Sequence, residues 1–457
     1  MKKTLLLSAL LAVTGVANAQ LWVKQNTFFI NESEGVQDIT PVSNSVVWAF
    51  GYDGSGNTAN FQDFTRTTDG GTSWSSGVVA LGDPELEFTN ISPVSATTAW
   101  VGAVSPTVGM GGVWKTSDGG NVWTQQNATA YTNAASFFNV VHFFDANVGV
   151  TQGDPINGAF ELYKTTNGGT SWTAITGAPA PASGEYGYNG GNVAAGTSFW
   201  FVTNQGKLYR TTDQGSTWTK LNTPITDFSG TATGGSIFFS DNNNGILIAR
   251  TGPVATATYT LYKTSNGGTT WSAGAAYNQP YTGFVSYVKG TSILVATGRT
   301  GAGTAASPYV FSSAYSLDNA TTWTVIESTT QGTATVQQKT GIAFNDPSTG
   351  WAGGFVDVNL EGGIFKYVGP ALSVSDVIAN SVKLVAYPNP ATSVINVKGA
   401  SINKIVAYDL LGKEVLSQEF SSQDEVSINV SSLKTGMYIM NVYNDNGAAQ
   451  TMKFTKS

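Results

Sequence analysis

Few side chains in this sequence are chemically reactive, and their types limit the chemistry that the protein could perform. The chain has no cysteine and a single histidine, His142, so it offers neither a thiolate nor a cluster suited to a transition metal. Carboxylates, arginines and tyrosines remain; these groups bind polar ligands, and two opposed carboxylates can hydrolyse a glycoside. Seven of them fall in predicted loops or at their borders: Asp53, Asp154, Glu185, Tyr186, Tyr188, Arg250 and Arg299. We expect them to mark a ligand-binding face, with no metal and no cofactor.

A nine-residue motif that recurs six times must position these residues. Its first copy is Arg-Thr-Thr-Asp-Gly-Gly-Thr-Ser-Trp, from Arg66 to Trp74, and successive copies are 46 to 53 residues apart. Glycines supply positive φ and an Asp or Asn side chain accepts hydrogen bonds from nearby amides, so the motif predicts a hairpin turn. Its fourth and ninth positions are Asp69 and Trp74, Asp118 and Trp123, Asn167 and Trp172, Asp213 and Trp218, Asn266 and Trp271, and Asp318 and Trp323. The period is typical of a propeller, a solenoid or an array.

The motif resembles the Asp box of the BNR repeat, which is found in sialidases, sortilin-type receptors and photosystem II assembly-factor-like propellers. The resemblance implies that each box is a structural turn between the third and fourth strands of a blade. The repeat as a whole is most similar to the photosystem II assembly-factor-like propellers, including Gly153-Asp154-Pro155. Those propellers use an arginine-rich patch to help assemble a reaction centre. This chain has four arginines, so we expect only the fold to carry over.

Seven repeats can be traced against six boxes. The seventh ends near Val368 without a box or an outer strand, whereas Leu21 to Asn26, at the other end of the chain, matches the outer strands of the other repeats. We therefore predict an all-β fold in which residues 20–368 form a seven-bladed β-propeller closed by the N-terminal strand. An eight-bladed ring or an open array would leave the complementary ends unexplained.

Antiparallel strands divide the loops of such a ring between two faces. One face carries the Asp boxes, and the other carries the loops between second and third strands and between blades. The seven candidate side chains belong to the second face, where loops of variable length are the usual place for function. His142 alternates with Val140 and Phe144 on an inner strand, so we expect it to be packed.

Two kinds of glycosidase can be weighed against a non-catalytic role. A sialidase binds the carboxylate of its substrate with three arginines. Two of the four arginines here, Arg66 and Arg210, are the first residues of Asp boxes and so lie on the other face of the ring. Only two arginines remain for a site, so we expect no sialidase. A two-carboxylate hydrolase stays open, with Asp154 opposed by Asp53 or Glu185, although Asp154 before a proline is also typical of a turn. A propeller that binds a protein or glycan without catalysis is our first hypothesis, and a secreted glycoside hydrolase is the alternative.

A second domain follows a linker at residues 369–382. Residues 383–457 contain about seven short strands, which predicts a small Ig-like β-sandwich. They also resemble the type A C-terminal sorting domain of the type IX secretion system, through Pro388, Asn389, Pro390, Gly412, Leu433, Gly436 and Tyr438. The resemblance implies recognition by an outer-membrane translocon, delivery to the cell surface or the medium, and a host among the Bacteroidota.

Residues 1–19 have the pattern of a secretory signal peptide. Two lysines precede an apolar run, and Ala17-Asn18-Ala19 follows as the cleavage site. No other apolar run approaches the roughly 20 residues of a membrane helix. Residues 20–372 carry 13 basic and 22 acidic residues, a net charge of −9, which argues against nucleic acid and anionic lipid as partners.

Overall fold

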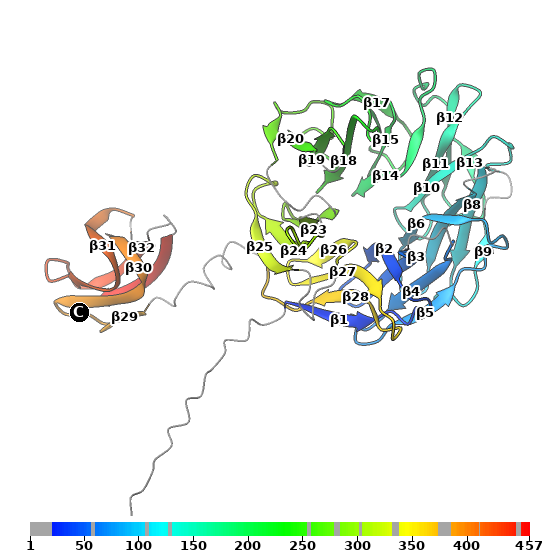
Figure 1. The fold of residues 1–457 in the computed structure, drawn as a ribbon. Coiled ribbons are helices and arrows are strands. Elements are labelled where there is room, and N and C mark those ends of the chain that lie inside the picture. Colours follow the sequence, from blue (N-terminus) through cyan, green and yellow to red (C-terminus); the bar gives the residue numbers. More distant parts are fainter. Residues whose placement is uncertain are drawn as a thin grey trace, which may run out of the picture. The chain divides into compact units, whose positions relative to one another are not determined.

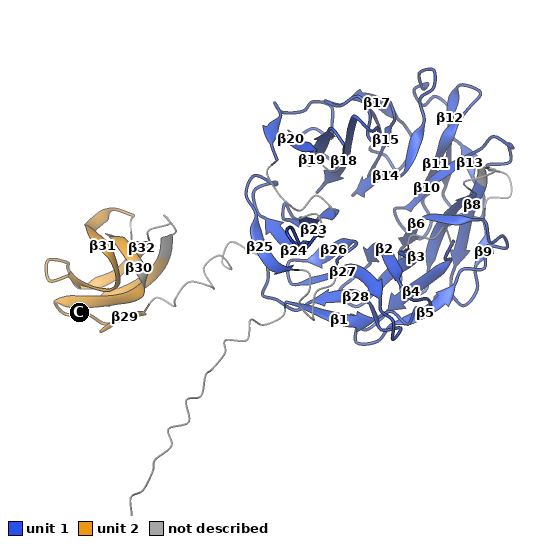
Figure 2. Cartoon of the chain, viewed as in Figure 1, with its two compact units in different colours: residues 1–371 blue, residues 372–457 orange. Residues whose placement is uncertain are grey.

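The structure is a computed structural model, and it divides the chain into two compact units, residues 1–371 and 372–457 (Figure 2). It describes residues 21–55, 60–105, 109–126, 130–253, 257–277, 284–300, 304–330, 338–372, 385–410, 412–444 and 449–457. The expected signal peptide and most of the expected linker lie outside these residues. Within them, no helix has the length and apolar character needed to cross a membrane.

The first unit is a ring of seven antiparallel blades (Figure 1). Blade one consists of β2 (Glu34–Pro41), β3 (Val47–Asp53), β4 (Asp63–Thr67) and β5 (Ser75–Val78). Blade two consists of β6 (Glu87–Pro93), β7 (Ala99–Ser105), β8 (Gly109–Thr116) and β9 (Thr124–Gln125). Blade three consists of β10 (Phe138–Phe143), β11 (Gly149–Ile156), β12 (Ala159–Thr165) and β13 (Thr173–Ala174). Blade four consists of β14 (Gly187–Ala195), β15 (Ser198–Thr203), β16 (Lys207–Thr211) and β17 (Thr219–Asn222). Blade five consists of β18 (Thr233–Phe239), β19 (Gly245–Thr251), β20 (Thr258–Thr264) and β21 (Ala275–Ala276). Blade six consists of β22 (Phe284–Tyr287), β23 (Leu294–Thr300), β24 (Val310–Ser316) and β25 (Thr324–Thr330). The all-β, seven-bladed propeller predicted from the repeats is confirmed.

The seventh blade takes its outer strand from the N-terminal end of the unit. It contains β26 (Ile342–Asp346), β27 (Thr349–Val356) and β28 (Gly362–Tyr367), and β1 (Trp22–Asn26) pairs antiparallel with β28. The Trp22 side chain is 1% exposed, and its indole N–H donates to Ser313 Oγ at 2.9 Å. The predicted closure of the ring by the N-terminal strand is thus confirmed.

The hydrophobic core lies largely between neighbouring blades, where aromatic rings pack. Trp100 of blade two stacks on Phe143 of blade three at 3.5 Å between ring centroids, and Trp200 of blade four stacks on Phe239 of blade five at 4.0 Å. Rings of this size bury a large apolar area and account for much of the stability of a fold without disulfides. The result is a ring of fixed geometry that carries its loops on two faces.

Each Asp box forms the predicted turn between third and fourth strands. In the first box, Asp69 Oδ1 accepts hydrogen bonds from Ser73 N at 2.9 Å and Thr67 Oγ1 at 2.8 Å. Gly70 and Gly71 have φ of 72° and 86°, which a side chain would strain. The hydroxyl of the second box residue also accepts the amide four residues on in all six copies. Local hydrogen bonds therefore define every one of these turns.

The first residue of most boxes reaches forward to the following blade. The contacts with distances in the normal range are Lys115 Nζ to Gly168 O (2.9 Å), Lys164 Nζ to Ser216 Oγ (2.7 Å), Arg210 Nη1 to Asn266 O (2.9 Å) and Lys263 Nζ to Thr321 Oγ1 (2.6 Å). Gln25 of β1 makes the same kind of contact to the first box, donating to Gly71 O at 2.5 Å and accepting from Trp74 Nε1 at 3.0 Å. The boxes thus tie neighbouring blades together.

The mixture of Asp and Asn at the fourth box position leads to a pH prediction. Hydrogen bonds from Ser73 and Thr67 lower the pKa of Asp69 to about 2, and the box hydrogen bonds likewise lower the pKa of Asp118, Asp213 and Asp318. A native pKa below that of the unfolded chain, about 3.9 for Asp, stabilises the fold above that pH and ceases to do so as the pH falls through the native value. We expect the urea midpoint of unfolding to fall between about pH 4 and pH 2.

A variant with Asn in all four of these boxes provides the matched control. Asn167 already supports the same turn, since its Oδ1 accepts from Ser171 N at 3.0 Å and its Nδ2 donates to Ser171 Oγ at 2.9 Å. The variant should therefore fold, and its midpoint should fall less steeply over this pH range. An unchanged slope would show that the boxes do not titrate as described.

The second unit is one five-stranded sheet with its own core. It consists of β29 (Val385–Tyr387), β30 (Val394–Tyr408), β31 (Glu414–Asn429), β32 (Gly436–Asn444) and β33 (Ala449–Lys456). Fewer strands appear than the seven expected because β30 and β31 are long, and their pairing shifts register between Lys398 and Ile402. Ala391 bridges to Lys456 at the far side of the sheet, which makes the domain barrel-like.

The sorting-motif residues help to build this second unit. Asn389 Oδ1 accepts from Thr455 N at 2.8 Å, and the Tyr438 hydroxyl donates to Lys434 O at 2.8 Å. Gly412 has φ of 83° in the turn between β30 and β31. Pro388 and Pro390 flank Asn389, Leu433 packs against the core, and Gly436 begins β32. The motif therefore includes residues on which the shape of the domain depends.

Candidate functional site

The seven candidate side chains lie at strand ends on the face away from the Asp boxes, but they form separate groups. Asp53 ends β3 in blade one, whereas Asp154 lies in β11 of blade three. Glu185, Tyr186 and Tyr188 lie where the chain enters β14 of blade four. Arg250 in β19 and Arg299 in β23 come from blades five and six. The ring therefore distributes them over several blades.

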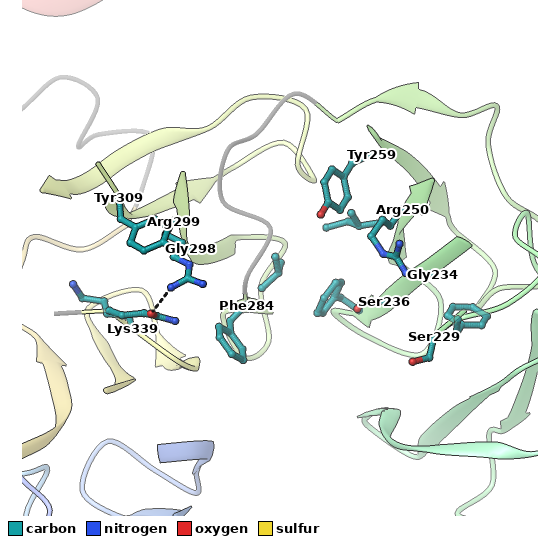
Figure 3. Close-up of a pocket in the computed structure, with 16 residues that line it drawn as sticks. Ser229, Gly234, Ser236, Arg250, Tyr259, Phe284, Gly298, Arg299, Tyr309 and Lys339 are labelled. Carbon is teal, nitrogen blue, oxygen red and sulfur yellow. Dashed lines mark hydrogen bonds between the residues drawn. The ribbon is translucent and has the colours of Figure 1, made fainter. Parts of the chain in front are cut away.

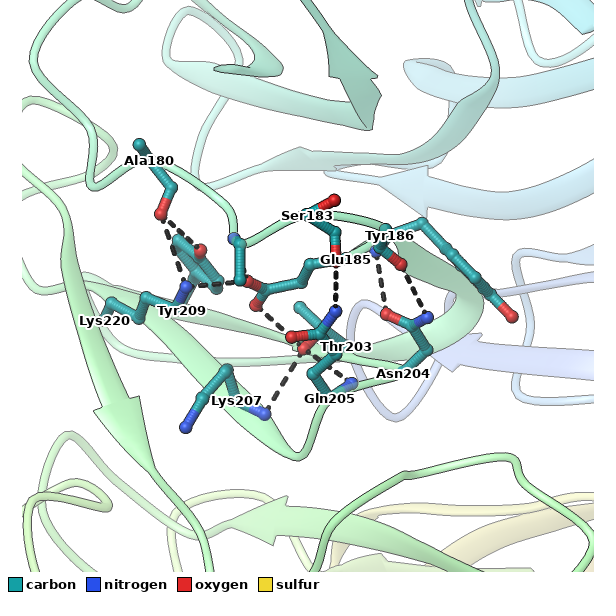
Figure 4. A network of polar contacts seen from close by, with 12 residues as sticks. Ala180, Ser183, Glu185, Tyr186, Thr203, Asn204, Gln205, Lys207, Tyr209 and Lys220 are labelled. Atoms are coloured by element: carbon teal, nitrogen blue, oxygen red, sulfur yellow. Dashed lines mark hydrogen bonds and ion pairs between the residues drawn. The ribbon is translucent and has the colours of Figure 1, made fainter. Parts of the chain in front are cut away.

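Glu185 is a buried anchor for the loop that joins blades three and four (Figure 4). Its Oε2 accepts from Lys220 Nζ at 2.6 Å and from Ala182 N at 2.7 Å, and its Oε1 accepts from Thr203 Oγ1 at 3.0 Å. Burial acts to raise the pKa of Glu185, but the hydrogen bonds that it accepts outweigh burial, so the pKa lies below its usual range. Both oxygens are engaged, which makes Glu185 a poor candidate for a ligand or proton-transfer group.

Asp154 joins blade three to blade four. Its Oδ1 accepts from Asn139 Nδ2 at 2.7 Å and from Gly187 N at 3.1 Å. Burial raises the pKa of Asp154, and burial together with the Asp154 charge raises the pKa of Glu161. The carboxylate that interacts with Asp154 is thus Glu161, which sequence reasoning missed. The available signal was the predicted hairpin of β11 and β12, because antiparallel pairing of these strands places the two residues near each other.

The other polar candidates on this side of the ring also have partners. Asp53 accepts from Ser55 N at 2.8 Å, a short-range turn contact. Tyr188 donates its hydroxyl to Asp227 Oδ1 at 2.8 Å, while the Tyr186 ring is 44% exposed and packs edge-on against Tyr188. Tyr186 is therefore the most accessible member of this group.

Blade one holds a second carboxyl group that sequence reasoning missed. Glu34 is buried at the start of β2, where burial and the charge of Asp63 raise its pKa to about 8. Its Oε2 accepts from Asn31 Nδ2 at 3.0 Å. Among the residues that the structure describes, no cluster of three or more His, Asp or Glu could hold a metal.

Arg250 and Arg299 line one pocket between blades five and six, with a volume of about 890 Å³ (Figure 3). This volume lies within the roughly 300–1,000 Å³ of small-ligand sites. The described residues that line it are Phe228, Ser229, Gly234, Gly235, Ser236, Phe238, Ile248, Arg250, Tyr259, Phe284, Val285, Gly298, Arg299, Tyr309, Gln338 and Lys339. They include three cations and no carboxylate. The fold thus gathers these two candidate residues into one cavity.

Each cation of the pocket is held differently. Arg250 donates to the carbonyls of Gly230 at 2.5 Å and Thr231 at 3.2 Å. The Arg299 guanidinium lies over the Tyr309 ring at 4.3 Å and donates to Gln338 Oε1 at 3.2 Å. Lys339 is less available for a ligand, since it pairs with Glu327 Oε2 at 3.0 Å, and burial lowers its pKa.

Sequence reasoning found the two arginines but missed the aromatic residues beside them. Tyr259, Phe284 and Tyr309 come from three separate segments, and only the packing of blade five against blade six brings them together. The repeat period was a usable signal: Arg250 and Arg299 lie about one repeat apart, at the ends of the second strands of successive blades. Residues so related belong on the same face of adjacent blades.

The fold and the loop geometry define the first unit as a seven-bladed β-propeller of the Asp-box type. A family model for the photosynthesis system II assembly factor YCF48 matches residues 107–245, and one for a secretion system C-terminal sorting domain matches residues 385–457. No curated protein matches the chain in sequence.

Two solved structures share the propeller fold. YCF48 from Cyanidioschyzon merolae is 15% identical with a TM-score of 0.51, and the alignment covers 76% of this chain and 99% of that one. A structure of YCF48 bound to a D1 peptide is also 15% identical, with a TM-score of 0.50 and coverage of 77% and 98%. The chain thus consists of a YCF48/BNR-type β-propeller domain and a C-terminal sorting domain. The sorting domain implies recognition by secretion machinery and export across the outer membrane.

Proposed function

We propose that this protein is a secreted or cell-surface propeller of a Bacteroidota-type host that binds a protein or glycan without catalysis. Residues 1–19 would direct it across the inner membrane, and the type IX translocon would then recognise its C-terminal domain. The pocket between blades five and six is the single observation that carries the binding role, because it combines a cavity of suitable size with convergent polar and aromatic groups. The YCF48 structure with a D1 peptide supports the view that this fold can hold another molecule.

The carboxylates support a non-catalytic role. Glu185 is held by three hydrogen bonds, and Asp154 accepts two from groups in its own and the next blade. A general acid or nucleophile must instead face its substrate within hydrogen-bond reach. One observation favours the alternative of a glycoside hydrolase: burial raises the pKa of Asp154, as a general acid requires, and a second carboxyl, Glu161, lies close enough for the charge of Asp154 to add to burial in raising its pKa.

An activity screen separates these two functions. The mature protein and an Asp154→Asn variant would be incubated with a panel of neutral and acidic polysaccharides, and the release of reducing ends measured. We expect no release by either protein. Release by the wild type that is lost in the variant would establish the hydrolase and refute the non-catalytic proposal.

A binding screen addresses the proposed role directly. Glycan arrays and pull-downs from the surface fraction of the host would use the mature protein, with a heat-unfolded sample as the control. We expect a ligand that is retained by the folded protein alone. Absence of any retained protein or glycan in both assays would contradict a binding function.

A further inference from the structure

We infer that the pocket between blades five and six binds an acidic glycan, a polysaccharide whose sugar rings carry carboxylates. This inference rests on the proposed binding function and adds the chemical class of the ligand. It follows from the charge of the pocket, the orientation of its arginines and the position of its aromatic rings (Figure 3).

The charge of the pocket is opposite to that of the domain around it. Residues 20–372 carry a net charge of −9, yet the charged residues that line the pocket, within the described part of the chain, are Arg250, Arg299 and Lys339. Lys339 is neutralised by Glu327, so two guanidinium groups set the local sign. A cationic cavity on an acidic body attracts an anion and disfavours a cation.

The two guanidinium groups are fixed before a ligand arrives. Backbone carbonyls of Gly230, Thr231 and Gly252 hold Arg250, and the Tyr309 ring supports the planar face of Arg299. Gln338 uses one of the five N–H donors of Arg299 among the contacts of the described residues. A guanidinium held in place loses less conformational entropy on binding, and its paired N–H groups match the two oxygens of a carboxylate.

Aromatic rings beside the arginines favour a sugar over a peptide as the bearer of these carboxylates. Phe284 is 40% exposed at the pocket, and Tyr259 stands on the facing wall, contributed by blade five. The C–H face of a sugar ring packs against such rings, while its hydroxyl groups find partners in Ser229, Ser236 and Tyr259. The acidic side chains of a peptide would use the arginines but would leave the rings without a partner.

Binding assays on the mature full-length protein test the inference. Isothermal titration would measure the affinity for polygalacturonate, with dextran as the neutral polysaccharide and poly-L-glutamate as the acidic peptide. We expect polygalacturonate to bind and the other two to bind at least about tenfold more weakly, a difference of 1.4 kcal/mol. Arg299→Gln and Phe284→Ala should each weaken polygalacturonate binding about tenfold.

Lys207→Gln is the charge-matched control. Lys207 lies on the same face in blade four, outside the pocket, and its Nζ contacts Asn222 Oδ1 at 2.8 Å. Its substitution should change the affinity less than twofold. Arg299 and Phe284 are both exposed and Lys207 is half-buried at the end of its strand, so the three variants should unfold at the wild-type temperature, and this is checked by circular dichroism.

Three other outcomes would overturn the inference, and they differ in whether they also refute the proposed binding function. Equal affinity for polygalacturonate and poly-L-glutamate, or no effect of Phe284→Ala, would show that the pocket binds carboxylates and does not recognise the sugar ring that carries them. Capture of a neutral glycan or a protein that Arg299→Gln leaves unchanged would refute the acidic-glycan pocket while preserving the proposed binding function. A protein that retains nothing in any assay would refute both.

Discussion

Deletion of residues 385–457 is expected to leave the propeller inside the outer membrane, with none at the cell surface or in the medium. These residues match the sorting domain of the secretion system and form a unit with its own hydrophobic core. The propeller has a separate core and should fold without them, so the loss should concern location and not stability. Fractionation of the host cells followed by immunoblotting of the propeller measures the outcome.

A reciprocal fusion controls for damage to the propeller. Residues 372–457 attached to a periplasmic reporter should carry the reporter out of the cell, whereas the same fusion with Asn389→Ala should export less of it. Asn389 bonds to the amide of Thr455 and so ties the start of the domain to its last strand. Normal surface display of the truncated propeller would refute the sorting role of the second unit.

Trp22→Ala is expected to lower the free energy of unfolding of the propeller by about 3–5 kcal/mol, the usual cost of removing a buried tryptophan side chain. The indole is 1% exposed and packs edge-on against Phe344 and Tyr367, at 5.9 Å and 5.3 Å between ring centroids. Its N–H also donates to Ser313 of the neighbouring blade. Substitution therefore weakens both the last blade and its contact with blade six. Urea unfolding followed by tryptophan fluorescence measures the loss.

Val23→Ala on the same strand is the control for this substitution. Val23 pairs with Lys366, but its side chain is 44% exposed, so truncation should cost much less. A Trp22→Ala protein that unfolds at the same urea concentration as Val23→Ala would mean that β1 contributes little to ring closure.

Sequence reasoning predicted the ring because the signals that build it are local. A box such as Arg66 to Trp74 contains its own hydrogen bonds and positive-φ glycines, so its turn can be predicted from a few residues. The closing strand was predicted for a similar reason, since the pattern from Leu21 to Asn26 repeats that of the outer strands. Both the box motif and the outer-strand pattern can be recognised in the sequence without knowledge of the tertiary structure.

The candidate site was only partly predictable because long-range partners decide what each polar group can do. Glu185 has the sequence of an exposed loop carboxylate, yet Lys220, 35 residues later, pairs with it. The pocket depends on how two blades pack, which brings Phe284 and Arg250 into one cavity without any short-range pattern. The second unit differs from the expected sandwich because bends within long strands are not visible in composition.

The pairing of β1 with β28 also constrains the order in which the ring can form. Synthesis proceeds from the N-terminus, so Trp22 emerges before any residue of the propeller that could cover it. Its partner Tyr367 follows only after the six other blades have been made. The earliest strand of the ring is therefore the one that forms its pairing last after synthesis, and Trp22 stays unpaired in every chain whose seventh blade has not yet formed.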